Sequence, residues 1–159
     1  MNGRDWHSML CVVSVSYVRE SVSTSSAFVA SFFQRHPSLK KYTVKVVDKS
    51  GSGEASHPEA RQHGDEVWLF PKFWQLPSEV QDFVFTHELG HWVHGEHGLA
   101  AVIEALSAAG IDAWDTDTLP FGQPNMMEAF ADVFAAYFLD KAELLRRYPA
   151  WAKVLSQFL

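Results

Sequence analysis

Hydrophobic and polar residues follow two periods along the chain, and each period predicts a different element. Strand side chains alternate between the two faces of a sheet, whereas helical side chains return to one face every three or four residues. The two-residue period at 12–18 and 43–47 and the apolar run at 66–70 predict three strands. The helical period predicts helices at 23–35, 99–109, 141–147 and 151–158.

The segment 48–65 has neither period. It is polar and contains Gly51, Gly53 and Gly64, so it is predicted as a mobile loop that leaves its histidines in solvent. No internal repeat is present along the chain.

A long helix is predicted to begin at Ser78, directly after Pro77. Ser78 and Gln81 have the spacing of a capping box, in which side chains bond the free amides of a helix start. Val80 and Val84 lie on the same helical stripe as the histidines that follow them. Those histidines are therefore expected to face the interior.

Length and composition favour one well-filled core. The chain has 159 residues, of which 47% are hydrophobic and 14% aromatic, and this predicts a single domain over 1–159. The net charge is −6 and no cluster of Lys or Arg exceeds two residues, so nucleic acid is not the expected partner. Cys11 is the single cysteine, which excludes an internal disulfide and a thiolate zinc site.

The chain shows no signal for a membrane or for secretion. No stretch approaches the roughly 18 apolar residues that span a bilayer, and the first twenty residues lack the features of a signal peptide. We expect no membrane span, and a location that is cytoplasmic or reached through a specialised export system. The oligomeric state is not indicated.

Residues 87–91 read His-Glu-x-x-His within the predicted long helix. Residues four apart on a helix have Cβ atoms about 5–6 Å apart, so His87 and His91 can offer two nitrogens to one ion. Glu88 lies beside them, where a carboxylate could polarise a metal-bound water and carry its proton. Gly90 allows another element to approach closely. Because the chain has 8 His, a chance pattern of core histidines is the alternative.

A catalytic zinc takes three protein ligands and leaves a fourth position for water, so a third ligand is needed. His97 follows His87 by ten residues, which is the metzincin spacing, but that pattern needs glycine where the chain has His94. Glu128 is the second candidate. Spacing alone leaves both open.

Glu128 belongs to a mostly apolar helix predicted at 125–139, with Asn125 as its expected N-cap. Glu128 and Asp132 are four apart and share a face. Burying two carboxylates without partners is costly or keeps them protonated. A zinc ion at Glu128 and a zinc-bound imidazole N–H at Asp132 would satisfy both. The alternative is a capping glutamate and a salt-bridged aspartate.

The two stretches together resemble a known family. His-Glu-x-x-His at 87–91, followed by 121–134, is similar to the gluzincin-type catalytic domain of the anthrax lethal factor and Pro-Pro endopeptidase family. There an aromatic-Gly-x-x-Asn-x-x-Glu-x-Phe-Ala-acid-x-Phe stretch follows the motif helix. The resemblance runs from about residue 66 to the end and implies that Glu128 is the third zinc ligand. The ImmA/IrrE-like metallopeptidases are similar in a less specific way.

One position departs from that family. Its members have a tyrosine, thought to donate a hydrogen bond to the oxyanion of the tetrahedral intermediate, where this chain has Phe121. Loss of one such donor costs on the order of 10²–10³ in rate. Candidates for a replacement are His94, His97 and Tyr137. A relative that binds zinc and peptide without cleavage is the alternative, although Glu88 would then have no chemical task.

Two further segments are candidates for substrate contact. By comparison with such zincins, Val67, Trp68 and Leu69 are expected in an edge strand that pairs with an extended substrate, with an ordinary core strand as the alternative. The acidic loop 112–120 lacks the closing glutamate of a calcium loop. It is expected to shape the rim of the cleft and to favour basic substrates.

These features predict an α+β fold, a zincin-like metallopeptidase domain in which a small mixed sheet packs against the motif helix and a second ligand-bearing helix. The expected function is hydrolysis of peptide bonds in a protein or peptide substrate. Zn²⁺ would be held by His87, His91 and Glu128, with Glu88 as general base for a zinc-activated water. A zinc-stabilised binding or assembly module with a fourth protein ligand is the alternative, and a zinc-free structural protein is the third possibility.

Overall fold

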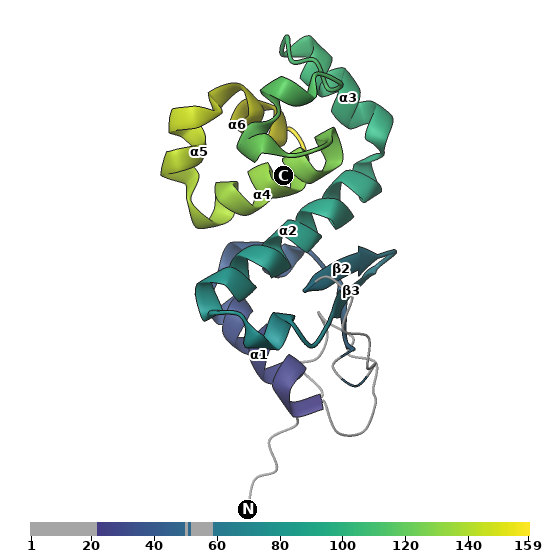
Figure 1. Cartoon of the computed structure of the whole chain (residues 1–159), viewed down its shortest axis with the longest axis vertical. Coiled ribbons are helices and arrows are strands. Elements are labelled where there is room, and N and C mark those ends of the chain that lie inside the picture. Colours follow the sequence, from purple (N-terminus) through teal and green to yellow (C-terminus); the bar gives the residue numbers. More distant parts are fainter. Residues whose placement is uncertain (1–21, 50, 52–58) are drawn as a thin grey trace, which may run out of the picture. The chain divides into compact units, whose positions relative to one another are not determined.

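The computed structural model describes residues 22–49, 51 and 59–159. These residues contain six α-helices and a three-stranded mixed sheet, so the chain is of the α+β class (Figure 1). The chain divides into two compact units, Met1–Leu76 and Pro77–Leu159, and each is described by itself. The single domain stays a prediction, and the strand expected at 12–18 lies outside the described residues.

The sheet of the first unit is built around β3 (Glu66–Leu69). β1 (Lys45–Asp48) pairs with β3 in parallel, and β2 (Ala60–His63) pairs with its other side in antiparallel. The predicted strands at 43–47 and 66–70 are confirmed.

The prediction of a substrate-binding edge at Val67, Trp68 and Leu69 is wrong. The strand order is β1-β3-β2, so both backbone edges of β3 already bond to neighbouring strands. An extended peptide can only add to a strand with an unpaired edge. β3 is a core strand, in which Val67 and Leu69 are fully buried.

β2 lies where the sequence predicted a loop. His63 pairs with Glu66 across the two-residue turn Gly64-Asp65, and Gly64 has a φ of 63°. Such turns favour glycine at their first position because it adopts positive φ without strain. The side chain of His63 is exposed, as expected, although its ring stacks on Trp68 with centroids 4.5 Å apart.

Helix α1 (Val22–Arg35) confirms the helix predicted at 23–35. It contacts β1 and buries Phe32 completely. Short 3-10 helices follow at Pro37–Lys41 (η2) and Phe73–Gln75 (η3). Buried aromatic and aliphatic side chains thus hold the first unit together.

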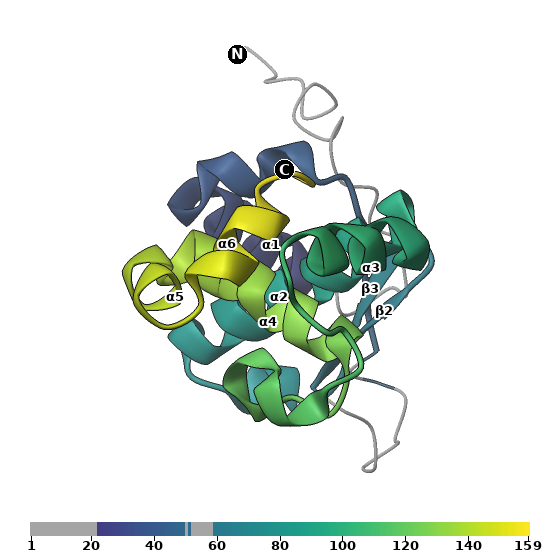
Figure 2. The same ribbon diagram turned by 90° about the horizontal axis from the view of Figure 1, so that it is seen from above.

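The second unit contains the remaining helices and confirms the predicted ones. They are α2 (Ser78–His97), α3 (Leu99–Ala108), η4 (Thr116–Thr118), η5 (Pro120–Gly122), α4 (Met126–Leu139), α5 (Lys141–Arg147) and α6 (Pro149–Leu155). α5 and α6 pack beside α4 (Figure 2). Within the described part of the chain, no helix combines the length and apolar character needed to cross a membrane.

The closest packing in this unit is between α2 and α4. A Cβ added at Gly90 would lie 2.8 Å from Ala131 Cα and 3.1 Å from the Ala131 carbonyl oxygen. Only glycine therefore permits this approach, as predicted. Around it, Leu89 and Phe130 are fully buried. The contact fixes the ligand-bearing faces of the two helices against each other.

The predicted N-terminal cap is confirmed for α4 and is wrong for α2. Asn125 caps α4, because its side chain accepts a hydrogen bond from the Glu128 amide at 3.0 Å. The capping box at Ser78 is wrong: Pro77 is the N-cap of α2 and no side-chain cap bond forms. Val80 also departs from the expected buried stripe, being 41% exposed, since the first turns of α2 lie before the contact with α4.

Candidate metal centre

Three side chains converge where α2 meets α4. His87 Nε2 lies 3.0 Å from His91 Nε2 and 3.2 Å from Glu128 Oε2, and His91 Nε2 lies 3.5 Å from Glu128 Oε1. The two histidines are one turn apart on α2, and Glu128 comes from the first turn of α4. This His-His-Glu group could hold a metal ion. Glu128, and not His97, is therefore the third residue that the structure brings to the pair.

His87 is held from the other helix. Its Nδ1 lies 2.7 Å from Asp132 Oδ1, and Asp132 is buried. The Gln123 amide nitrogen donates to the second carboxylate oxygen of Asp132. A hydrogen bond of this kind fixes both the ring orientation and the tautomer, leaving Nε2 directed at the other potential ligands.

His91 is held from its own helix. Its Nδ1 lies 3.0 Å from His94 Nε2, and the His94 ring packs edge-on against Phe130 with centroids 5.8 Å apart. His94 thus contacts the side of the His91 ring that faces away from His87 and Glu128. The structure makes it a partner of a potential ligand. The prediction of His94 as a candidate oxyanion donor did not include this contact, although the spacing of three residues between His91 and His94 was its signal.

The two histidines have opposite pKa shifts. Burial lowers the pKa of His87, but the hydrogen bond to Asp132 and the charges of Glu88, Asp132 and Glu128 outweigh it and raise the pKa above 6.5. Burial, together with His87 and His94, lowers the pKa of His91 to about 3. Burial also lowers the pKa of His94. His91 and His94 are therefore neutral at pH 7, which is the form in which an imidazole can bind a metal.

Glu88 lies next to this group. It is 8% exposed, and its charge is one of those that raise the pKa of His87. A carboxylate in such a place is close enough to act on a group bound at the histidines.

Two other predicted residues are not brought to the centre. α2 continues without a break to His97, so at 1.5 Å per residue His97 lies about 15 Å further along the axis than His87. Its ring packs against Phe158. Tyr137 lies nine residues after Glu128, about half a turn out of phase on α4, and its hydroxyl accepts a hydrogen bond from Lys141 at 3.1 Å. Neither can serve the roles expected of them, because a regular helix directs them elsewhere.

A residue of the loop before α4 makes a contact that the sequence did not predict. Phe121 has a φ of 59° and is the only described non-glycine residue with positive φ. Its amide donates to the Tyr148 hydroxyl at 3.1 Å, which also accepts a hydrogen bond from Arg147 at 3.0 Å. Both of these bonds use the oxygen of Tyr148, so its proton is left to donate elsewhere. Tyr148 lies 27 residues from Phe121, and no local pattern indicates the contact.

Comparison with known proteins adds no further guide. No protein-family model matches the chain, and no match is found among the curated proteins. The geometry of the centre and the motifs in the sequence are therefore what indicates a function for this chain.

Proposed function

We propose that the chain is a zinc-dependent endopeptidase of the gluzincin type with a zincin-like fold, as the resemblance to the lethal factor and Pro-Pro endopeptidase family implies. The observation that carries the proposal is the convergence of His87, His91 and Glu128. Glu88 beside them completes the His-Glu-x-x-His motif. The substrate would be a protein or peptide.

The spacing of the three side chains fits zinc. Zinc binds imidazole nitrogen and carboxylate oxygen at about 2.0–2.2 Å in tetrahedral geometry, which places neighbouring ligand atoms about 3.3–3.5 Å apart. Here the two histidine Nε2 atoms lie 3.0 Å apart. Glu128 places Oε2 at 3.2 Å from His87 Nε2 and its other oxygen, Oε1, at 3.5 Å from His91 Nε2. Three protein ligands leave one tetrahedral position for water or substrate, as in catalytic sites.

The surrounding hydrogen bonds also fit. A metal-binding histidine directs one nitrogen lone pair at the ion and donates its other N–H. Asp132 can accept that bond from His87 Nδ1, and His94 Nε2 can accept it from His91 Nδ1. Both rings are thus held with Nε2 toward Glu128.

Zinc and Glu88 would have different tasks in the reaction. When bound, zinc would supply Lewis acidity, which makes water a nucleophile at neutral pH and polarises the scissile carbonyl. Glu88 takes the proton of the attacking water and passes it to the leaving amine. Glu88 is 8% exposed, and a buried charge acts more strongly on its neighbours than a solvated one, which supports this role.

Tyr148 is our candidate for the hydroxyl that Phe121 cannot supply. Among the described tyrosines it is the one whose hydroxyl bonds the loop bearing Phe121. That loop continues to Gln123, which bonds Asp132 behind His87. The O–H proton of Tyr148 would be donated to the oxyanion.

A zinc-stabilised binding module is the second candidate. It would need a fourth protein ligand, because structural zinc sites are usually closed. His94 Nε2 already meets His91, and His97 lies too far along α2, so the described residues favour the open site. A metal-free protein would instead use the histidine contacts as hydrogen bonds, and zinc titration distinguishes it.

The test is peptide cleavage by wild type and by Glu88→Gln, assayed on a peptide library after both have been loaded with zinc. The substitution removes the base and keeps the size of the side chain, so zinc should remain while turnover falls by about 10²-fold or more. Glu96→Gln, an exposed glutamate on the same helix, is the matched control and should leave turnover unchanged. A fully active Glu88→Gln enzyme would contradict the mechanism.

A further inference from the structure

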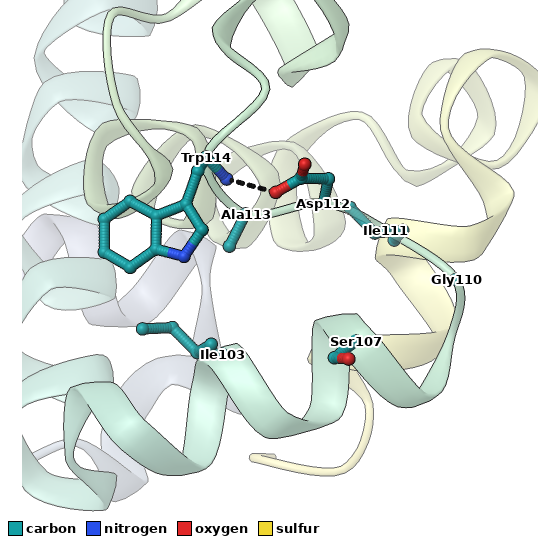
Figure 3. A pocket seen from close by; sticks show the side chains of 7 residues that line it. All are labelled: Ile103, Ser107, Gly110, Ile111, Asp112, Ala113 and Trp114. Carbon is teal, nitrogen blue, oxygen red and sulfur yellow. Dashed lines mark hydrogen bonds between the residues drawn. The ribbon is translucent and has the colours of Figure 1, made fainter.

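A second feature of the Pro77–Leu159 unit lies on α3 and the loop that follows it. Ile103, Ser107, Gly110, Ile111, Asp112, Ala113 and Trp114 line a cavity of about 360 Å³. Figure 3 shows the indole of Trp114 on the loop side and Ile103 and Ser107 on the helix side. The volume is at the lower end of that of ligand pockets, which is about 300–1,000 Å³.

The walls of this pocket are built by a defined chain reversal. Gly110, with a φ of 74°, ends α3, and its amide bonds the Ser107 carbonyl while the Ile111 amide bonds the Leu106 carbonyl. This pair of bonds is the Schellman motif, which requires glycine or asparagine at that position. Ala113 is then buried and anchors the loop.

Local hydrogen bonds hold the loop beyond Ala113. Asp112 Oδ1 accepts from the Trp114 amide at 2.9 Å, and Asp115 Oδ1 accepts from the Asp117 amide at 3.2 Å. Such turns fix the backbone of a loop through its own side chains. The backbone that carries Trp114 is therefore fixed by these bonds.

Trp114 itself is unusual in its exposure. It is 72% exposed, more than any other large hydrophobic side chain in the described residues. Leu99, at 40% exposure, lies on the same stripe of α3 as Ile103 and Ser107 and extends the apolar surface. Exposed aromatic side chains of this size next to a cavity are typical of interaction sites.

The charge around the pocket has one sign. The segment 99–120 contains Glu104, Asp112, Asp115 and Asp117 and no Lys, Arg or His. All four acids are exposed, and none forms an ion pair with another described residue. A cation placed over the indole would therefore meet the ring face and uncompensated carboxylates together.

We propose that this pocket binds an arginine or lysine side chain of a basic segment in a partner polypeptide. The alkyl stem of the side chain packs on Ile103 and the indole of Trp114, and its cationic head lies near Asp112 and Asp115. Arginine is favoured over lysine, because its planar guanidinium stacks on indole and bonds carboxylates in two places. The pocket shares no residue with the metal centre, so binding at the pocket does not depend on the proposed peptidase activity.

The pocket is tested by NMR titration of the full chain, following the indole N–H signals of its 6 Trp. Loss of one signal in Trp114→Phe assigns Trp114. The probes are four capped hexapeptides that differ only at one central position, which is Arg, Lys, norleucine or Glu. We expect the arginine peptide to shift the Trp114 signal and to bind at least about fivefold more tightly than the norleucine peptide. The glutamate peptide should not bind.

Substitutions then separate the parts of the pocket. Trp114→Ala should weaken binding of the arginine peptide at least about fivefold, because the cation then loses the indole face. The pair Asp112→Asn with Asp115→Asn should weaken it by a similar factor, because asparagine keeps the side-chain bonds of the loop and removes the charge. Leu145→Ala, at an apolar residue 48% exposed on α5, is the matched control and should bind like wild type.

Three results would overturn the inference. Equal binding of the arginine and norleucine peptides would show that the pocket is an apolar groove that does not prefer a positive charge. A Trp114 signal that no basic peptide moves would remove the site. Sedimentation that shows a dimer in wild type and a monomer in Trp114→Ala would show that a second copy of the chain covers the pocket.

Discussion

The two sides of the candidate metal centre differ in what holds their histidine. On one side, His87 bonds the buried carboxylate of Asp132, which lies on α4. On the other, His91 bonds the imidazole of His94, which lies on the same helix three residues on. The hydrogen bond to His87 therefore depends on how α2 and α4 pack, whereas the bond to His91 is made within α2.

The partners also differ in charge, and this changes how each nitrogen competes for protons. The carboxylates around His87 raise its pKa despite burial, whereas burial and neighbouring histidines lower the pKa of His91 to about 3. An anionic partner makes a ligand more basic and so strengthens its bond to a metal. The same effect makes that ligand bind protons more readily. One centre thus combines a ligand of raised pKa with one that stays neutral in acid.

Gly90→Ala is expected to have the largest effect, because it disturbs the contact between α2 and α4 that brings Asp132 and Glu128 to the histidines. The new Cβ would meet Ala131 backbone atoms at 2.8 and 3.1 Å, so α4 must shift. Overpacking of this kind lowers the free energy of unfolding by about 1–3 kcal/mol, which urea denaturation measures. Zinc affinity should fall as well. Gly95→Ala is the matched control, since its Cβ meets nothing within 4 Å. It should stabilise the helix by about 0.5–1 kcal/mol, and an equal loss in both variants would contradict the account.

Asp132→Asn tests the charge on the His87 side. Asparagine retains the shape and an acceptor oxygen but removes the negative charge, and its amide nitrogen would oppose the Gln123 donor. We expect zinc affinity, measured by competition with a chelator, to fall about 10–100-fold. Asp117→Asn, at an exposed carboxylate on η4, should leave affinity unchanged. Wild-type affinity in Asp132→Asn would mean that the carboxylate does not act on the ligand.

The pH dependence of zinc binding separates the two sides. A metal must displace the proton of His87 below its raised pKa, so affinity is full above that pKa and falls about tenfold per unit below it. His91 adds no second proton until pH approaches about 3. One proton should therefore be released per zinc bound in the pH range just below the pKa of His87. In Asp132→Asn the onset should move to lower pH, and release of two protons over this range would contradict the assignment.

His94→Ala should have the smallest effect on zinc affinity. His94 is neutral at pH 7 and contacts His91 from within the same helix. Loss of the imidazole leaves His91 Nδ1 without its acceptor, and zinc affinity should fall by about tenfold or less. His94→Gln offers an acceptor oxygen on a shorter side chain and should restore part of that loss. His97→Ala, another histidine of α2 that contacts Phe158, is the control and should bind zinc like wild type. A larger loss for His97→Ala than for His94→Ala would favour the metzincin-like third ligand.

The sequence predicted those features that depend on short spacings. The pairing of His87 and His91 and the Asn125 cap follow from helix geometry over at most four residues. Gly90 indicated that another element approaches closely, without indicating which one. Glu128 was one of two candidates on spacing, and the family resemblance favoured it. The structure brings Glu128 to the pair because α4 crosses α2.

The features that the sequence did not predict depend on tertiary contacts. Tyr148 meets Phe121 across 27 residues, and nothing in either segment indicates the other. β3 is central because β2 pairs with one of its sides. The residues of β2 are mostly polar and do not form a strand pattern, so the Gly64-Asp65 turn was the one local signal of this strand. Tyr137 and His97 were candidates because of their chemistry, but helix phase and rise exclude them from the centre.

The most direct test of the central claim is the zinc content of the purified protein. Elemental analysis would compare wild type, Glu128→Ala and His97→Ala, all purified in the same way without added metal. We predict about one zinc per chain in wild type and in His97→Ala and none in Glu128→Ala, because two imidazoles alone make an incomplete site. A wild-type protein that contains no zinc and takes up none on titration would contradict the account and leave His87 and His91 as core residues.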